Sequence, residues 1–131
     1  MSVAVGTELP PFTFDRIDMP TIHGIMEIMH DVNPVHDDEA LVERLGLRGP
    51  VNQGPANLAY MMNMLRNFAG ADGELERLEF RFLDTVTTGD VVTAGGKVTA
   101  VEGERVECEI WLNRDDGVRA VSGSARLRIG A

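Results

Sequence analysis

The sequence contains a single cysteine, only 12 lysines and arginines, and no apolar run approaching the ~18 residues of a membrane span. Cys108 has no partner for an internal disulfide, and its place in an alternating strand pattern indicates a core thiol in a reducing compartment. The 21 acidic residues give a net charge of -9, which argues against a nucleic-acid binder, because phosphate recognition needs a basic face.

The start of the chain has none of the basic residues that open a signal peptide. Because a membrane span is also missing, we expect a soluble, cytoplasmic protein. The 131 residues suit one domain, 1–131, long enough to bury about two-thirds of its unfolded surface in a single core.

The first half of the chain predicts one strand followed by three helices. Apolar residues recur at spacings of three and four, which is typical of amphipathic helices, and the apolar side of the first helix should face the core. The third helix is apolar almost all round, as expected for a helix that a sheet surrounds. The expected ranges are a strand over 9–17 and helices over 21–30, 34–45 and 55–69.

The second half predicts long antiparallel strands, because apolar and polar residues alternate from position 78 to position 129. Gly95 and Gly96 indicate a bulge or bend, and Asp115, Asp116 and Gly117 indicate a hairpin turn. The fold class expected is therefore α+β, with a curved antiparallel sheet wrapped around the long central helix.

A carboxylate and an imidazole lie five residues apart, at Asp31 and His36, with Asn33 and Pro34 between them. Proline disfavours the α conformation in the preceding residue, so the first helix must end before Asn33. Asn33 can then cap the next helix with Pro34 as its first residue, which places His36 in the opening turn. This folds Asp31 back toward His36, so that both can reach one water molecule as an acid–base dyad.

Two other interpretations of the same residues stay open. An ordinary turn before a solvated helix explains most of them, and His23 is then a surface residue. A metal site built from His30, Asp31, His36 and Asp38 is the second, although its spacing matches no standard zinc pattern.

The glycine-rich segment 46–54 leads into the long apolar helix. Gly54 lets a ligand approach the backbone closely, and its N–H together with the helix dipole can hold an oxyanion. Pro55 has no N–H, so Gly54 carries more of this role than the first residue of an ordinary helix would.

Three features combine in this chain: Asp31-x-Asn33-Pro34-x-His36-x-Asp38, then Gly54 before a long apolar helix, then Gly89-Asp90 between strands. Together they resemble the MaoC-like, (R)-specific enoyl-CoA hydratases of the hotdog fold, over roughly residues 9 to 129. The short chain and its Gln53-Gly54-Pro55 variant look like the small subunit of the steroid side-chain enoyl-CoA hydratase of sterol-degrading bacteria.

The resemblance implies a single hotdog domain that hydrates a 2-enoyl-CoA to a 3-hydroxyacyl-CoA. Asp31 and His36 match the residues that activate water, and the Gly54 N–H matches the donor to the thioester oxygen. Asn33 matches an orienting turn residue, and Gln53 stands where the family usually has histidine. The resemblance implies that both residues bind substrate. The family needs no cofactor, because coenzyme A is part of the substrate.

The resemblance also implies a partner, either a different hotdog subunit in a heteromer with a bulky steroid acyl-CoA, or a second copy in a homodimer. Hotdog domains pair so that their sheets join. The cations for the coenzyme A phosphates stay unassigned among Arg48, Arg66, Arg81, Arg126 and Arg128.

Two rival functions share this fold. A hotdog thioesterase is expected to carry a carboxylate on its central helix, but residues 55–69 contain neither Asp nor Glu. A non-catalytic acyl-CoA-binding subunit would have no need to keep both Asp31 and His36.

Overall fold

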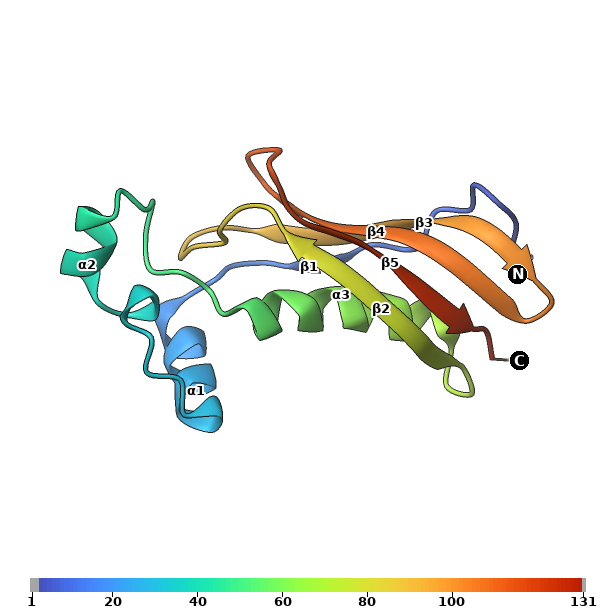
Figure 1. Cartoon of the computed structure of the whole chain (residues 1–131), viewed down its shortest axis with the longest axis horizontal. Helices are drawn as coiled ribbons and strands as arrows, with labels where there is room; N and C mark the ends of the chain where they lie inside the picture. Colours follow the sequence, from blue (N-terminus) through green and yellow to red (C-terminus); the bar gives the residue numbers. More distant parts are fainter. Residues whose placement is uncertain (1–2, 131) are drawn as a thin grey trace.

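The computed structural model describes residues 3–130, so positions 1, 2 and 131 of the expected domain lie outside the described part. A five-stranded antiparallel sheet in the order β1-β3-β4-β5-β2 packs on one long helix, α3 (Figure 1). The elements are β1 Phe12–Phe14, α1 Met19–Met29, the 3₁₀ turn η1 Pro34–His36, α2 Glu39–Arg44, α3 Gly54–Ala69, β2 Glu74–Phe82, β3 Val92–Glu102, β4 Arg105–Arg114 and β5 Arg119–Arg128.

The core lies between the sheet and α3, which contacts all five strands. Met61, Met64 and Leu65 of α3 are fully buried, as Ile110 of β4 and Leu127 of β5 are. The expected α+β fold, with an antiparallel sheet around a buried helix, is confirmed. Within residues 3–130, no helix combines the length and the apolar character that a membrane crossing needs.

Side chains alternate across the sheet as the sequence predicts. Val121, Ala125 and Leu127 of β5 are buried, while Arg126 lies on the exposed face. Cys108 of β4 is also buried, and this burial raises the pKa of its thiol to about 11. The predicted core thiol is therefore confirmed, because a thiol with such a pKa stays protonated and unreactive at neutral pH.

The helix expected over 34–45 is wrong as a single element. The chain forms η1 first, breaks at Asp37, and starts again as α2. The Asp38 carboxylate accepts a hydrogen bond from Leu41 N–H at 3.0 Å, so Asp38 caps a new helix instead of continuing the old one. His36 therefore ends a short 3₁₀ turn and does not sit in the first turn of a long helix.

The apolar side of α1 reaches the core less than expected. Of the predicted apolar side, Ile22 is fully buried, and Ile25 and Met26 pack partly against the core, but Met29 is 47% exposed. The reason is position: α1, η1 and α2 lie beyond one end of the sheet, and α3 runs beneath the sheet itself (Figure 1).

Gly95 and Gly96 form no bulge, so the bulge, one of the two alternatives that the sequence indicated, is wrong. They pair regularly with Trp111 and Ile110 of β4, and the irregularity in this ladder falls after Val98. A Cβ atom on Gly95 would lie 2.5 Å from Nε1 of Trp111. Glycine is therefore needed here because the indole lies directly against the strand.

Candidate active site

The end of α1 turns Asp31 toward His36. His30 has a left-handed backbone with φ 52°, and Asp31 N–H donates to the carbonyl of Met26 at 2.9 Å, which closes the helix end. Oδ2 of Asp31 then lies 3.1 Å from Nε2 of His36. The predicted convergence of these two side chains is observed, and their catalytic roles stay predictions.

Asn33 organises the turn between them. Its N–H donates to Oδ1 of Asp31 at 3.0 Å, and its own Oδ1 accepts from Val35 N–H at 3.2 Å. The Asn33 side chain thus caps η1, with Pro34 as the first residue, as the sequence predicts. Asn33 fixes the orientation of Asp31 through the backbone, which fits an orienting residue at a substrate site.

The His36 ring is held from its other side. His36 is only 7% exposed, and its Nδ1 lies 2.6 Å from the carbonyl oxygen of Val51. A carbonyl oxygen only accepts hydrogen bonds, so Nδ1 carries the hydrogen. Nε2 then turns its lone pair toward Oδ2 of Asp31, so these two atoms can form a hydrogen bond when the imidazole and the carboxyl group share one further proton.

A pair that shares one proton can act as acid and base in the same site. One group accepts a proton from a bound water while the other donates the shared proton to a substrate atom. The carboxyl group is the more accessible of the two, because the Asp31 side chain is 27% exposed whereas the His36 side chain is 9% exposed.

Val51 connects the dyad to the rest of the fold. Its N–H donates to the carbonyl of Val35 at 2.9 Å, and its carbonyl accepts from His36. Val51 also forms an antiparallel bridge with Thr87 in the connection between β2 and β3. Three residues later the chain reaches Gly54, and three residues span at most about 10 Å.

Gly54 is the first residue of α3, and no protein acceptor for its N–H is found among residues 3–130. With no side-chain cap at Gln53 and no N–H on Pro55, the positive end of the α3 dipole is left for a ligand. A Cβ on Gly54 would lie 2.9 Å from Cζ of Phe82. Glycine is therefore needed here because the Phe82 ring packs directly against the backbone at the start of α3.

Gln53 faces the interior and not the surface. It is 1% exposed, and its Nε2 donates to the carbonyl of Ile22 at 2.9 Å, which ties α1 to the start of α3. Its Oε1 accepts no hydrogen bond from any residue between 3 and 130. The predicted contact of Gln53 with substrate stays a prediction.

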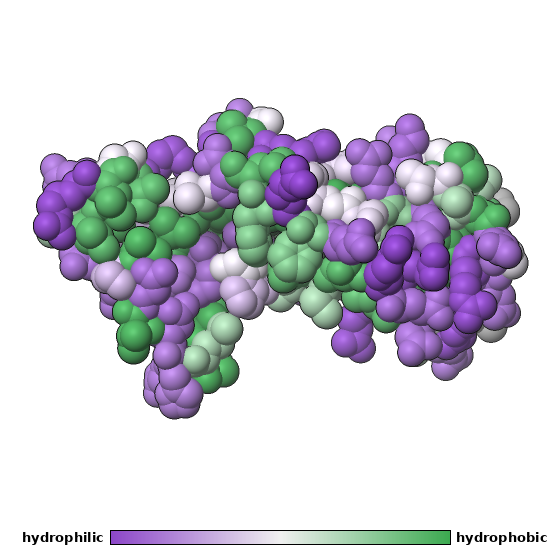
Figure 2. Space-filling model, viewed as in Figure 1, coloured by the Kyte–Doolittle hydropathy of each residue, from purple (hydrophilic) through white to green (hydrophobic). Residues whose placement is uncertain are grey.

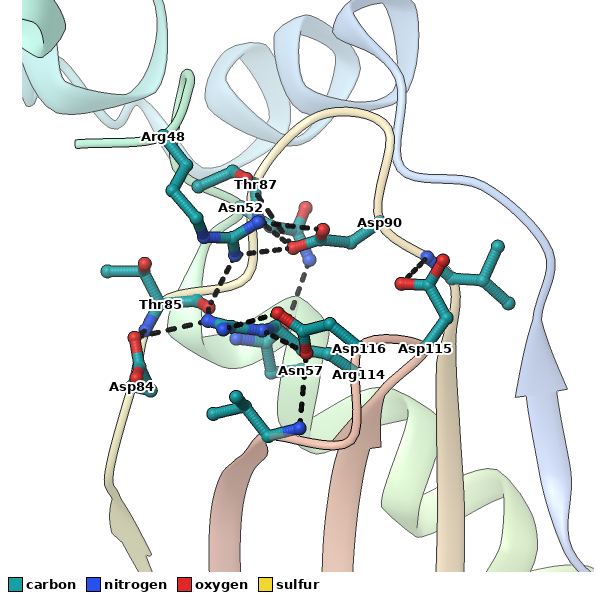
Figure 3. Close-up of polar contacts among 12 residues, drawn as sticks. Arg48, Asn52, Asn57, Asp84, Thr85, Thr87, Asp90, Arg114, Asp115 and Asp116 are labelled. Carbon is teal, nitrogen blue, oxygen red and sulfur yellow. Dashed lines mark hydrogen bonds and ion pairs between the residues drawn. The ribbon is translucent and has the colours of Figure 1, made fainter.

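A charged network beside the site was missed by the sequence analysis (Figure 3). Arg48 forms a two-pronged contact with Asp90, and buried Arg114 forms another with Asp116. Both arginines also donate to the carbonyl of Thr85. Only the Gly89-Asp90 turn gave a signal in the sequence, and it did not identify Arg48, which lies 42 residues away.

The network also bears on the unassigned phosphate cations. Arg48 is bound to Asp90, Arg126 to Glu107, and Arg128 lies 3.8 Å from Glu74. Of the five arginines considered, Arg66 and Arg81 form no ion pair within residues 3–130.

The alternative interpretation, a metal site built from His30, Asp31, His36 and Asp38, is wrong for the described part of the chain. Between residues 3 and 130, no three His, Cys, Asp or Glu side chains are grouped as metal ligands. His30 and Asp38 accordingly do not join Asp31 and His36 in a ligand set.

Comparison with known proteins gives a fold but no sequence family. No protein-family model matches the chain, and no curated protein does. The (R)-hydratase from A. caviae involved in PHA biosynthesis is 21% identical, with a TM-score of 0.88 over 98% of both chains. The ChsH1-ChsH2 complex from Mycobacterium tuberculosis is 19% identical, with a TM-score of 0.85 over 98% of this chain and 100% of that chain.

A third similar structure is the unliganded R-hydratase PhaJ1 from Pseudomonas aeruginosa. It is 20% identical, with a TM-score of 0.86 over 97% of this chain and 82% of that chain. Likeness at this level of identity shows a shared hotdog fold over nearly the whole chain.

Proposed function

We propose that this chain is a MaoC-like hotdog hydratase, which adds water to a 2-enoyl-CoA to form a 3-hydroxyacyl-CoA. One observation carries the proposal: Asp31 and His36 meet at 3.1 Å, and the Val51 carbonyl fixes which His36 nitrogen faces the carboxyl group. The hydratases that share its fold over nearly the whole chain support the assignment.

The geometry suggests how the dyad and Gly54 divide the work. The Asp31–His36 pair removes a proton from water as the water oxygen attacks the β-carbon. The electron pair of the double bond moves onto the thioester oxygen, where the Gly54 N–H and the α3 dipole stabilise the enolate. The pair then returns one proton to the α-carbon, so its own proton count is restored. No cofactor is needed in this scheme.

We extend the proposal to a second hotdog subunit. β2 is the edge strand of the sheet, and Phe80, Phe82 and Leu83 near its end are 42%, 49% and 50% exposed. Figure 2 shows apolar atoms gathered where β2 ends. An exposed edge with aromatic residues favours pairing with another chain. Because Phe82 covers Gly54, a subunit on this edge would also form one wall of the site where the Gly54 N–H meets the thioester oxygen.

The acyl group and the partner are the finer parts of the proposal. The Gln53-Gly54-Pro55 variant and the short chain support a bulky steroid side-chain enoyl-CoA and a heteromeric partner. The fold shared with the ChsH1-ChsH2 complex agrees with assembly from two different chains. Pairing with a second copy is the alternative, and the charge pattern of β2 favours it.

The test is a hydration assay on short-chain and polycyclic enoyl-CoA thioesters, with the chain alone and co-expressed with candidate hotdog chains. We expect Asp31→Asn and His36→Ala to lose on the order of a hundredfold or more in turnover while staying folded, because each removes one acid–base group. Near-normal hydration by either variant would remove the dyad from the mechanism.

The same assay separates the rival functions. A thioesterase would release free coenzyme A thiol, which a thiol reagent detects, and would form no 3-hydroxyacyl-CoA. A non-catalytic subunit would give a complex whose activity does not change with Asp31→Asn.

A further inference from the structure

We propose that Arg48 and Asp90 are a positioning pair for the dyad, acting through the backbone of residues 50–52. This inference rests on the proposed function, since it assigns a role in that same site. Neither residue touches Asp31 or His36, so the pair acts by fixing the chain segment that holds the His36 ring.

Asp90 is the anchor of the pair. It is 7% exposed, and its carboxylate accepts from both terminal nitrogens of Arg48, at 3.0 and 2.8 Å. Oδ2 also accepts from Thr87 N–H at 2.8 Å. Burial acts to raise the pKa of Asp90, but the hydrogen bonds from Arg48 and Thr87 outweigh it and hold the pKa below its ordinary value. The carboxylate is therefore charged when it binds both residues.

Two short segments meet next to this anchor. Residues 50–52 run antiparallel to residues 86–88, with Asn52 N–H donating to Val86 at 2.7 Å and Thr88 N–H donating to Pro50 at 3.1 Å. Arg48 lies just before the first segment and Asp90 just after the second. Their contact thus clamps the open end of this two-stranded ribbon and fixes its register.

Val51 transmits the register to the dyad. Its two backbone groups bind Val35 and the His36 ring, so the ribbon determines where the Val51 carbonyl lies. A shift of this carbonyl by about 1 Å lengthens the hydrogen bond to Nδ1 beyond useful range. His36 can then carry its hydrogen on either nitrogen, so Nε2 no longer presents the same group to Asp31 in every molecule.

The experiment compares Asp90→Asn with Asp116→Asn as a matched control. Asp116 also binds an arginine with both oxygens, at 3.1 and 2.8 Å, in the same part of the molecule (Figure 3), but it makes no contact with residues 50–52. Each variant removes the negative charge of a carboxylate that binds one arginine with both of its oxygens. Nitrogen NMR of the His36 side chain reports the tautomer, and steady-state kinetics separates kcat from KM.

We expect Asp90→Asn to mix the two His36 tautomers and to lower kcat on the order of 10- to 100-fold with KM nearly unchanged. Asp116→Asn should leave the His36 signals and kcat as in the wild type. Arg48→Lys keeps the positive charge but loses the two-nitrogen contact with Asp90. Its effect should therefore lie between those of Asp90→Asn and Asp116→Asn. If Asp90→Asn does not fold, Arg48→Gln carries the same comparison, because the Arg48 side chain is 43% exposed.

Wild-type His36 signals and kcat in folded Asp90→Asn or Arg48→Gln would overturn the inference, as would equal losses in Asp116→Asn. The tautomer measurement needs no substrate. It therefore still decides the role of the pair if the wild-type chain hydrates no enoyl-CoA, whereas that result would count against the proposed function alone.

Discussion

His30 is the one residue other than glycine with a positive φ among residues 3–130, and it directly precedes Asp31. A side chain in the left-handed region costs roughly 1–2 kcal/mol, because Cβ approaches the following carbonyl. This conformation ends α1 and reverses the chain, and the reversal directs Asp31 toward His36. The cost thus falls at the residue that fixes the direction of the proposed catalytic carboxylate.

We predict that His30→Gly stabilises the fold by about 0.5–1 kcal/mol, because glycine adopts this φ without steric cost. Chemical denaturation measures the free energy of unfolding. The matched control is His23→Gly, at an exposed position inside α1, which should destabilise by a similar amount because glycine is a poor helix former. Destabilisation by both substitutions would contradict the role assigned to the φ of His30.

The break between η1 and α2 is the feature that defines the site at the level of elements. A continuous helix over 34–45 would carry the chain directly away from Asp31. Instead, Asp38 caps α2 separately, and η1 stays free to bind Val51 through Val35 and His36. The Asp38 cap is therefore what separates the dyad turn from the helix that follows.

Removing this cap should loosen α2 locally. We predict that Asp38→Ala costs about 1 kcal/mol, because the Leu41 N–H loses its acceptor. Amide hydrogen exchange at Leu41 and Val42 should then speed up by roughly fivefold. Asp37→Ala is the control, since the neighbouring exposed carboxylate caps nothing, and its exchange rates should match the wild type. Equal acceleration in both variants would mean that the negative charge, not the cap, holds α2.

How far the sequence predicted the site depends on the range of each interaction. The Asn33-Pro34 step acts on its immediate neighbours, so the approach of Asp31 to His36 followed from local geometry. The His36 contact with Val51 spans 15 residues and the Arg48 contact with Asp90 spans 42, and neither leaves a local pattern. The break at Asp37 was missed because the next residue, Asp38, suits a helix cap and a first helical turn alike.

At the scale of the whole molecule, the unpaired edge of β2 is the feature that a single chain leaves unexplained. The other long strands pair on both sides, whereas β2 pairs with β5 alone. Phe80 and Phe82 pack edge to face near the end of this strand and remain 42% and 49% exposed. A partner strand along this edge would bury both rings and satisfy the free backbone groups.

The β2 sequence is self-complementary in one register. If two copies pair antiparallel with Phe80 opposite Phe80, Leu78 lies opposite Phe82 and Glu79 lies opposite Arg81 on the other face. Leu78, Phe80 and Phe82 then all meet apolar residues, and two Glu79–Arg81 pairs of opposite charge form. Centring the pair on Glu79 instead would place Arg77 opposite Arg81, where like charges repel.

We predict that the purified chain, without another hotdog chain, forms a dimer in this register. A cysteine at Phe80→Cys should cross-link to itself with a short bifunctional maleimide, because the residue lies on the two-fold axis. Glu79→Cys and Arg81→Cys should cross-link faster when mixed than alone, because each lies directly opposite the other and only diagonally from its own copy. The wild type should not react because Cys108 is buried. Denaturing electrophoresis measures the products. A cross-link from Phe80→Cys to a co-expressed different hotdog chain, with none between copies, would assign this edge to a heteromer instead.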